Sequence, residues 1–92
     1  MLRVFKISGD SLYPFYKNGE RVLCCRVFSK TNILVDDTVV FEKSSYGLMI
    51  KRVKRVEQNK YFVEGSNPYS IDSRNFGALS KKELKYKVYF KF

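Results

Sequence analysis

The sequence contains no histidine among its 92 residues, and this absence removes several kinds of chemistry. A Ser-His-Asp triad and histidine-based metal sites are excluded within the chain. Two adjacent cysteines without histidine also make a poor ligand set, so we predict neither a metal nor another cofactor. Acid–base catalysis at neutral pH would need a lysine, cysteine, aspartate or glutamate with a shifted pKa.

Cysteine is scarce, and its two positions are neighbours, Cys24 and Cys25. Neighbouring residues of a strand point to opposite faces, and a disulfide between them would be strained. We therefore expect reduced thiols that serve as ordinary core residues of a cytosolic protein.

Long apolar runs are also lacking, since the longest has four residues, Val22-Leu23-Cys24-Cys25. A bilayer-spanning helix needs about 20. The start of the chain lacks the basic, apolar and small-residue succession of a signal peptide. We expect a cytoplasmic protein without a transmembrane segment, and peripheral contact with a membrane or a membrane partner stays open.

Acidic residues are few: the chain has nine Asp and Glu compared with 18 Lys and Arg, which gives a net charge of +9. Such a surplus is typical of a solvated basic surface, and it also attracts nucleic acid, an anionic membrane or an acidic substrate. Charge alone does not choose among these partners.

The residues that are present predict a mainly β fold in one domain, residues 1–92. Apolar residues make up 45% and aromatic residues 16% of the chain, enough for a compact core. Segments rich in Val, Ile, Phe and Tyr predict strands over residues 2–7, 20–27, 38–42, 48–57, 60–64 and 85–90. Gln58-Asn59 predicts a hairpin turn, and Ser80 with Glu83 predicts one short helical turn. We expect a single compact, coiled, β-barrel-like domain.

Three short segments carry side chains suited to chemistry: residues 7–14, 50–53 and 65–77. Each has an ordinary explanation when taken alone. A serine after Gly-Asp is typical of a turn or a helix cap, and a strand lysine usually faces solvent. A Ser-x-Asp-Ser-Arg loop is typical of a surface segment that forms its own hydrogen bonds.

Taken in order, the three segments resemble the motifs of the serine-lysine signal peptidases and the related LexA-type self-cleaving repressors. Residues 9–14 match Gly-x-Ser-Met-x-Pro with Leu12 in place of Met, and residues 51–53 match Lys-Arg-Val. Residues 65–67 match Gly-Asp-Asn with Ser66 in place of Asp, and residues 70–77 match Ser-x-Asp-Ser-Arg-x-x-Gly. Gly19-Glu20 stands where a Gly-Asp pair usually opens the second strand.

The Ser-x-Asp-Ser-Arg block is similar to the signal peptidase branch, since the repressor branch lacks it. The small size and missing anchor resemble the short soluble members of this superfamily. One such group is the maturation proteases that trim nickel superoxide dismutase precursors.

The resemblance implies that Ser11 is the nucleophile and Lys51 its general base. A lysine acts as a base only when neutral, and its ordinary pKa of about 10.4 must fall, which burial achieves. Strand alternation places Lys51 on one face with Met49 and Val53, an apolar strip that points inward. The neighbouring cations Arg52, Lys54 and Arg55 are expected to lower the pKa further.

The resemblance also implies supporting residues. Ser70 would hydrogen-bond the Lys51 amine and fix its direction, and an ion pair of Asp72 with Arg74 would hold the loop under the site. The backbone N–H of Ser11, with a group from Gly9 or Asp10, would stabilise the oxyanion.

These residues predict a serine endopeptidase that cleaves an extended peptide or precursor protein, by resemblance after small residues such as Ala. Two alternatives stay open. One is a domain of the same fold that binds a peptide or protein partner without cutting. The other is a basic nucleic-acid-binding barrel, with Arg52, Lys54 and Arg55 on phosphates and Tyr61 and Phe62 stacking on bases. For the protease we expect no specific nucleic acid partner.

Overall fold

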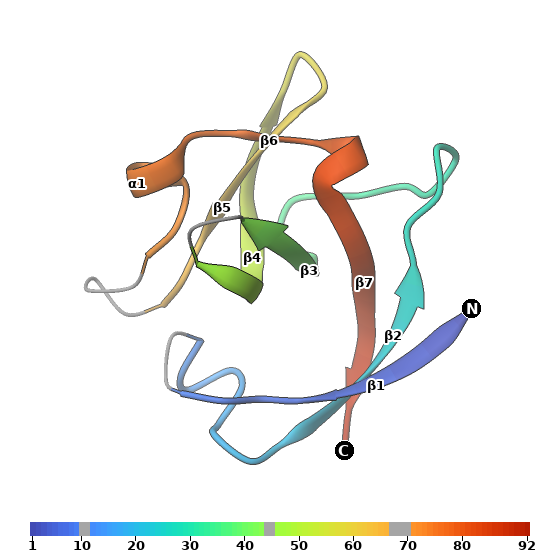
Figure 1. Ribbon diagram of the computed structural model, residues 1–92, viewed down its shortest axis with the longest axis vertical. Helices are drawn as coiled ribbons and strands as arrows, with labels where there is room; N and C mark the ends of the chain where they lie inside the picture. The colour runs from blue at the N-terminus through green and yellow to red at the C-terminus, as the bar shows by residue number, and fades with distance from the viewer. Residues whose placement is uncertain (10–11, 44–45, 67–70) are drawn as a thin grey trace.

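The computed structural model describes residues 1–9, 12–43, 46–66 and 71–92, and these form a mainly β structure (Figure 1). The elements in chain order are β1 (Leu2–Lys6), β2 (Arg21–Arg26), β3 (Thr38–Lys43), β4 (Gly47–Glu57), β5 (Lys60–Glu64), α1 (Ser73–Phe76), β6 (Leu79–Ser80), the 3-10 turn η1 (Lys81–Glu83) and β7 (Leu84–Lys91). The radius of gyration is 12.1 Å, close to the roughly 12 Å of a compact chain of this length.

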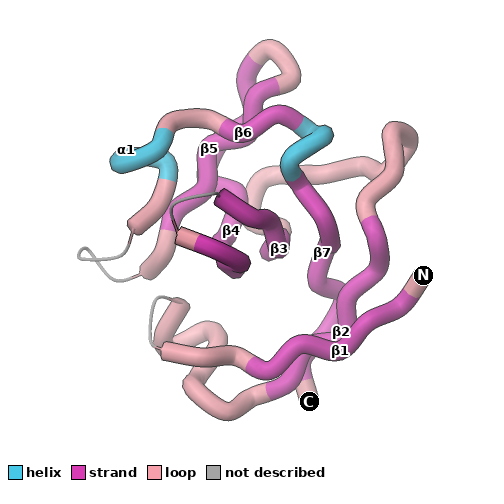
Figure 2. Tube along the Cα trace, viewed as in Figure 1, coloured by secondary structure: helices cyan, strands magenta, loops and turns pink. Residues whose placement is uncertain are grey.

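The strands form one antiparallel sheet in the order β1-β2-β7-β3-β4-β5-β6. The sheet is strongly curved, and β3 and β4 lie near the middle of the view (Figure 2). The expected barrel-like closure is wrong, because the sheet stays open: over the described residues no ladder joins its two edge strands, β1 and β6. A barrel requires the ladder to run on from the last strand to the first, and β6 has only two residues with which to extend it.

The six predicted strands are confirmed, with bounds that differ by at most one residue at each end. The hairpin between β4 and β5 is also confirmed, since Glu57 pairs with Lys60 across the turn. Gln58 and Asn59 have φ angles of 49° and 62°, the pattern of a type I′ turn, whose twist matches that of the flanking strands.

Strand β3 is buried on both faces, which makes it the centre of the fold. Val39 and Phe41 belong to one core cluster and Val40 to a second, since alternate residues of a strand point to opposite sides. The first cluster contains Ile33, Val39, Phe41, Val53, Tyr61, Val63, Leu79 and Leu84. The second contains Ile7, Val22, Cys24, Val40, Tyr86 and Val88. Strand β4, the partner of β3, therefore lies next to the most buried strand of the sheet.

Two short helical elements follow β5. The predicted turn at residues 80–83 is confirmed as η1, where the Ser80 N–H donates to Glu83 Oε1 at 3.0 Å. Helix α1 lies where the sequence indicated a polar loop, and it begins after the N-cap residue Asp72. No helix in the described part of the chain is long and apolar enough to cross a membrane. Both cysteines are free thiols, Cys24 buried and Cys25 half-buried.

Candidate active site

Lys51 lies in the middle of β4, directly opposite Val39 of β3. Only 4% of its surface is exposed, so the predicted inward orientation is confirmed. Met49 packs against the same core cluster that contains Val53. A lysine on such an apolar strip cannot be solvated as it would be at the surface.

The pKa of the Lys51 amine is lowered from its ordinary value, first because burial disfavours the charged ammonium. The Asp72 carboxylate opposes this shift, and the Arg74 guanidinium adds to it. The direction agrees with the prediction. The cation that contributes is Arg74, which α1 brings near, rather than the sequence neighbours of Lys51.

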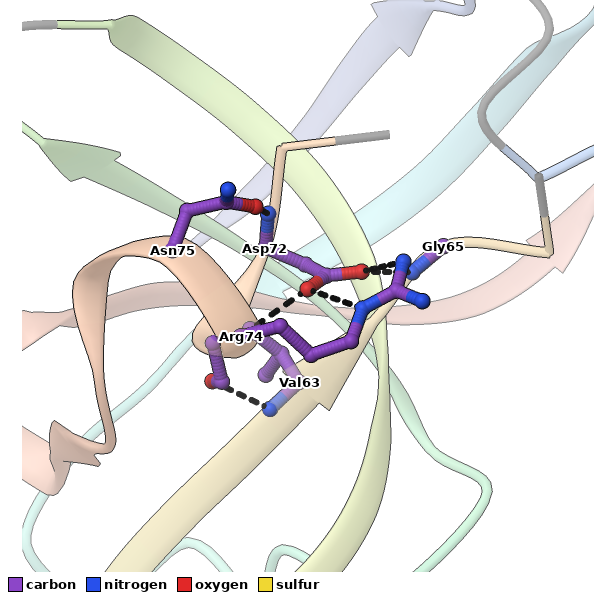
Figure 3. Close-up of polar contacts among 6 residues, drawn as sticks. Val63, Gly65, Asp72, Arg74 and Asn75 are labelled. Carbon is purple, nitrogen blue, oxygen red and sulfur yellow. Dashed lines mark hydrogen bonds and ion pairs between the residues drawn. The ribbon is translucent and has the colours of Figure 1, made fainter. Parts of the chain in front are cut away.

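Asp72 and Arg74 form a bidentate ion pair, shown in Figure 3. Arg74 Nε donates to Asp72 Oδ1 at 2.9 Å, and its terminal nitrogen donates to Oδ2 at 2.7 Å. The backbone N–H groups of Arg74 and Gly65 donate to the same carboxylate at 3.0 and 3.2 Å. This network satisfies a carboxylate whose exposed fraction is zero.

Hydrogen bonding, rather than burial, decides the charge of Asp72. Burial alone would raise the pKa of the carboxyl, but the bonds from Arg74 and Gly65 together hold that pKa below its ordinary value. Asp72 therefore stays anionic at neutral pH, next to a lysine that burial drives toward its neutral form.

Three residues of the third segment, for which no role of their own was predicted from the sequence, hold this network in place: Ser73, Asn75 and Gly65. The Asp72 N–H donates to Asn75 Oδ1 at 3.1 Å, which completes a capping box at the start of α1. The Val63 N–H donates to Ser73 Oγ at 2.8 Å and ties α1 to β5 (Figure 3). The spacing Asp-x-x-Asn was a signal of this cap that could have been used.

A cavity of about 290 Å³ lies next to Lys51. Its lining includes Ile7 and Ser8, which follow β1, and Leu48, Ile50 and Lys51 of β4. The structure thus brings the segment that leads to Ser11 and the strand that carries Lys51 to one cavity. The mixture of apolar side chains with a lysine and a serine suits a peptide ligand.

The proposed nucleophile Ser11, its neighbour Asp10 and the supporting Ser70 lie outside the described residues. The described residues on either side of Ser11 are anchored. The Gly9 N–H donates to Asn18 Oδ1 at 2.9 Å, and Leu12 is only 1% exposed. Because its N–H is engaged by Asn18, Gly9 does not offer a free backbone donor to an oxyanion.

Of the residues named for the alternative of a nucleic-acid-binding surface, two aromatic rings and two cations make contacts within the protein, and Lys54 is exposed. Tyr61 is 7% exposed and belongs to the core, and the guanidinium of Arg55 covers the ring of Phe62 at 4.1 Å from the centroid. Arg52 is held by Asp36 at 3.0 Å and lies 4.3 Å from the ring centroid of Phe15. These aromatic rings and cations are engaged within the protein.

Over the described residues, no three His, Cys, Asp or Glu side chains gather as metal ligands. Comparison of the chain with models of known protein families and with the sequences of curated proteins gives no match.

Proposed function

We propose that this chain is a serine endopeptidase in which Ser11 is the nucleophile and Lys51 the general base. One observation carries the proposal: Lys51, a buried lysine with a lowered pKa, lines the same cavity as Ser8. Ser8 precedes Ser11 by three residues in the sequence. A serine hydroxyl needs such a base to become a useful nucleophile, and a neutral amine can serve in a chain without histidine.

In the proposed reaction, the neutral Lys51 amine takes the proton of the Ser11 hydroxyl as the oxygen attacks the peptide carbonyl. The resulting ammonium gives this proton to the leaving amine, and an ester on Ser11 remains. Lys51 then takes a proton from water as the water oxygen attacks the ester. The ammonium returns this proton to the Ser11 oxygen as the bond to the acyl group breaks, and the second product leaves with a new carboxyl group. The N–H of Ser11 and a group from Asp10 would stabilise the oxyanion; losing one such donor typically costs about 10²–10³ in rate.

Asp72 and Arg74 would act as positioning residues. Their ion pair fixes α1 and the strand end at Gly65, and the two charges shift the pKa of Lys51 in opposite directions. The pair therefore leaves burial as the main cause of the shift. Ser70 would complete the arrangement by a hydrogen bond to the Lys51 amine, as the resemblance implies.

The substrate in this proposal is an extended peptide or precursor protein. The cavity next to Lys51 is lined by Leu48, Met49 and Ile50 of β4, which offer apolar contacts to alternate side chains of an extended chain. By resemblance, small residues such as Ala would be preferred one and three positions before the cut. The proposal also includes a coiled β domain of the signal peptidase and LexA type for this chain. It further includes peripheral contact of the chain with a membrane or a membrane partner.

The test is cleavage of a library of peptides and candidate precursor proteins, read by mass spectrometry. We expect Ser11→Ala to abolish turnover. We expect Lys51→Met, which keeps the length and apolar stem of the side chain, to lower turnover by about 10²–10⁴-fold, the usual contribution of a general base. Circular dichroism checks that both variants fold.

The matched control is Lys54→Met, which removes an exposed lysine of the same strand that does not line the cavity. It should cleave at near the wild-type rate. Equal turnover in wild type, Ser11→Ala and Lys51→Met would contradict the assignment. Binding of library peptides without any cleavage would favour the alternative of a non-enzymatic peptide-binding domain.

A further inference from the structure

A second cavity, of about 360 Å³, lies where the end of β2 meets η1 and the start of β7. Four cations line it: Arg26, Lys81, Lys82 and Lys85. No carboxylate is among its lining residues. Its residues are different from those of the cavity beside Lys51, so it is separate from the proposed active site.

These four cations lie together without an acidic partner in the part of the chain that the structure describes. In the described residues, none of the four lies within ion-pair distance of a carboxylate. The cations that do form ion pairs are Lys43, Arg52, Arg55, Arg74, Lys87 and Lys91. The acid next to Lys82 in the sequence, Glu83, is engaged by Lys43 at 2.7 Å. The positive charge around the cavity is therefore uncompensated.

The cavity also has an apolar side. Phe28 lines it with 58% of its surface exposed, which leaves its ring open to a ligand. Val27 and Leu84 are the other apolar lining residues; Leu84 is a core residue and Val27 packs against the core. An exposed aromatic ring beside uncompensated cations suits a ligand that joins an aromatic group to a strong anion.

Two hydrogen bonds hold the walls of the cavity together. Lys81 Nζ donates to the carbonyl oxygen of Ser29 at 2.9 Å, which joins η1 to the segment after β2. The Val27 N–H donates to the carbonyl oxygen of Lys85 at 2.9 Å, which joins that segment to β7. Lys81 keeps two further ammonium donors for a ligand. The segments that carry the four cations are thus joined by hydrogen bonds without a ligand.

We propose that this cavity binds a nucleotide, with its phosphates on Arg26, Lys81, Lys82 and Lys85 and its base against Phe28. The volume lies within the range of about 300–1,000 Å³ that is typical of small-molecule sites. Phosphate groups accept several charge-assisted hydrogen bonds at once, because each has more acceptor oxygens than a peptide carboxylate. Base–aromatic stacking uses the exposed ring.

The test is isothermal titration calorimetry with ADP, pyrophosphate and adenosine as probes. We expect ADP to bind more tightly than either fragment. Lys81→Gln/Lys85→Gln should weaken ADP binding by about tenfold or more, because two charge-assisted contacts are lost. Phe28→Leu should weaken binding of ADP and leave that of pyrophosphate unchanged.

The matched control is Lys17→Gln/Lys54→Gln, which removes the same charge from exposed positions outside the cavity. It should bind ADP like the wild type. Equal loss in both double variants, or equal affinity for ADP and pyrophosphate, would overturn the proposal. Tight binding of a single-stranded oligonucleotide without binding of ADP would overturn it in favour of a polynucleotide surface. Because the Ser11→Ala variant serves equally well in this experiment, the result does not depend on peptidase activity.

Discussion

A lysine in the core must either find a counter-charge or lose its own charge, and Lys51 shows both tendencies. Burial lowers its pKa, while Asp72 nearby favours the charged form. A group whose pKa is lowered in the folded state binds fewer protons there than in the unfolded chain. Folding stability then rises with pH between the lowered pKa and the ordinary value of 10.5.

We therefore predict that the pH dependence of stability changes when Lys51 is replaced by Met. The free energy of unfolding from urea titrations, measured from about pH 7 to about pH 10, should rise less steeply with pH in Lys51→Met than in the wild type. Lys51→Met should also be the more stable protein at the lower end of this range. Lys54→Met, at an exposed position of the same strand, should keep the wild-type slope. Identical slopes in all three proteins would show that the Lys51 pKa is not lowered.

The orientation of Lys51 could be predicted from sequence because a strand has a simple repeat. Apolar Met49 and Val53 flank it at two-residue spacing, and the structure buries Lys51 as that pattern requires. The electrostatic neighbours could not be predicted in the same way. Arg74 is far from Lys51 in the sequence, and it is α1 and its cap that bring it near.

At the scale of elements, α1 is a four-residue helix that depends on its cap. Asp72 accepts bonds from the backbone of Arg74 and Gly65 and pairs with the Arg74 side chain. A helix this short cannot be stable by itself, since helix nucleation is unfavourable. The position of α1 is therefore set by Asp72 and by the bond from Val63 to Ser73.

We predict that Asp72→Ala destabilises the fold by about 3 kcal/mol, because the change removes a helix cap and leaves buried donors without a partner. Arg74→Gln should cost less, since the Arg74 side chain is about half exposed. Urea titration measures both. Because the Asp72 pKa is lowered on folding, its contribution is present above the ordinary value of 3.8 and is lost at lower pH. The difference between wild type and Asp72→Ala should shrink as the pH falls from about 5 toward 2.

The control for this prediction is Asn75→Ala, which removes one bond to the Asp72 N–H and leaves the carboxylate network intact. It should cost less than Asp72→Ala and should show no change with acid pH. A pH-independent difference between wild type and Asp72→Ala would contradict a lowered Asp72 pKa.

The six longer strands and η1 were predictable, whereas β6 and α1 were not, for a physical reason. A strand of five or more residues shows alternation, the polar pair Gln58-Asn59 between two such strands indicates a turn, and Ser80 with Glu83 matches a capping box. Strand β6 has two residues and α1 has four, too few for any period to emerge. The open sheet also needed the structure, because the pairing of β7 with both β2 and β3 joins residues far apart in the chain.

At the scale of the whole molecule, the excess of positive charge is unevenly distributed. Ion pairs engage cations of β3, β4, α1 and β7, whereas no carboxylate lines the cavity at the end of β2. A net charge of +9 on a domain with a radius of gyration of 12.1 Å brings like charges close together. Such self-repulsion opposes the compact state.

We predict that salt stabilises this fold. Added NaCl shortens the screening length to about 10 Å at 0.1 M, so repulsion spread over the molecule weakens more than short ion pairs do. Raising NaCl from about 20 mM to about 200 mM should increase the midpoint of thermal unfolding by about 4 °C, the shift that roughly 1 kcal/mol produces in a domain of this size. Differential scanning calorimetry measures the midpoint.

The matched variant is Lys17→Gln/Lys54→Gln/Lys60→Gln, whose three changes at exposed positions reduce the net charge from +9 to about +6. It should start from a higher midpoint at low salt and gain less from added NaCl, because less repulsion is left to screen. If the midpoint of the wild type falls as NaCl rises, the ion pairs outweigh the repulsion. Repulsion among the cations that line the cavity at the end of β2 would then lower the free energy of unfolding little. An anion bound there would stabilise the fold through its own contacts and not by relieving that repulsion.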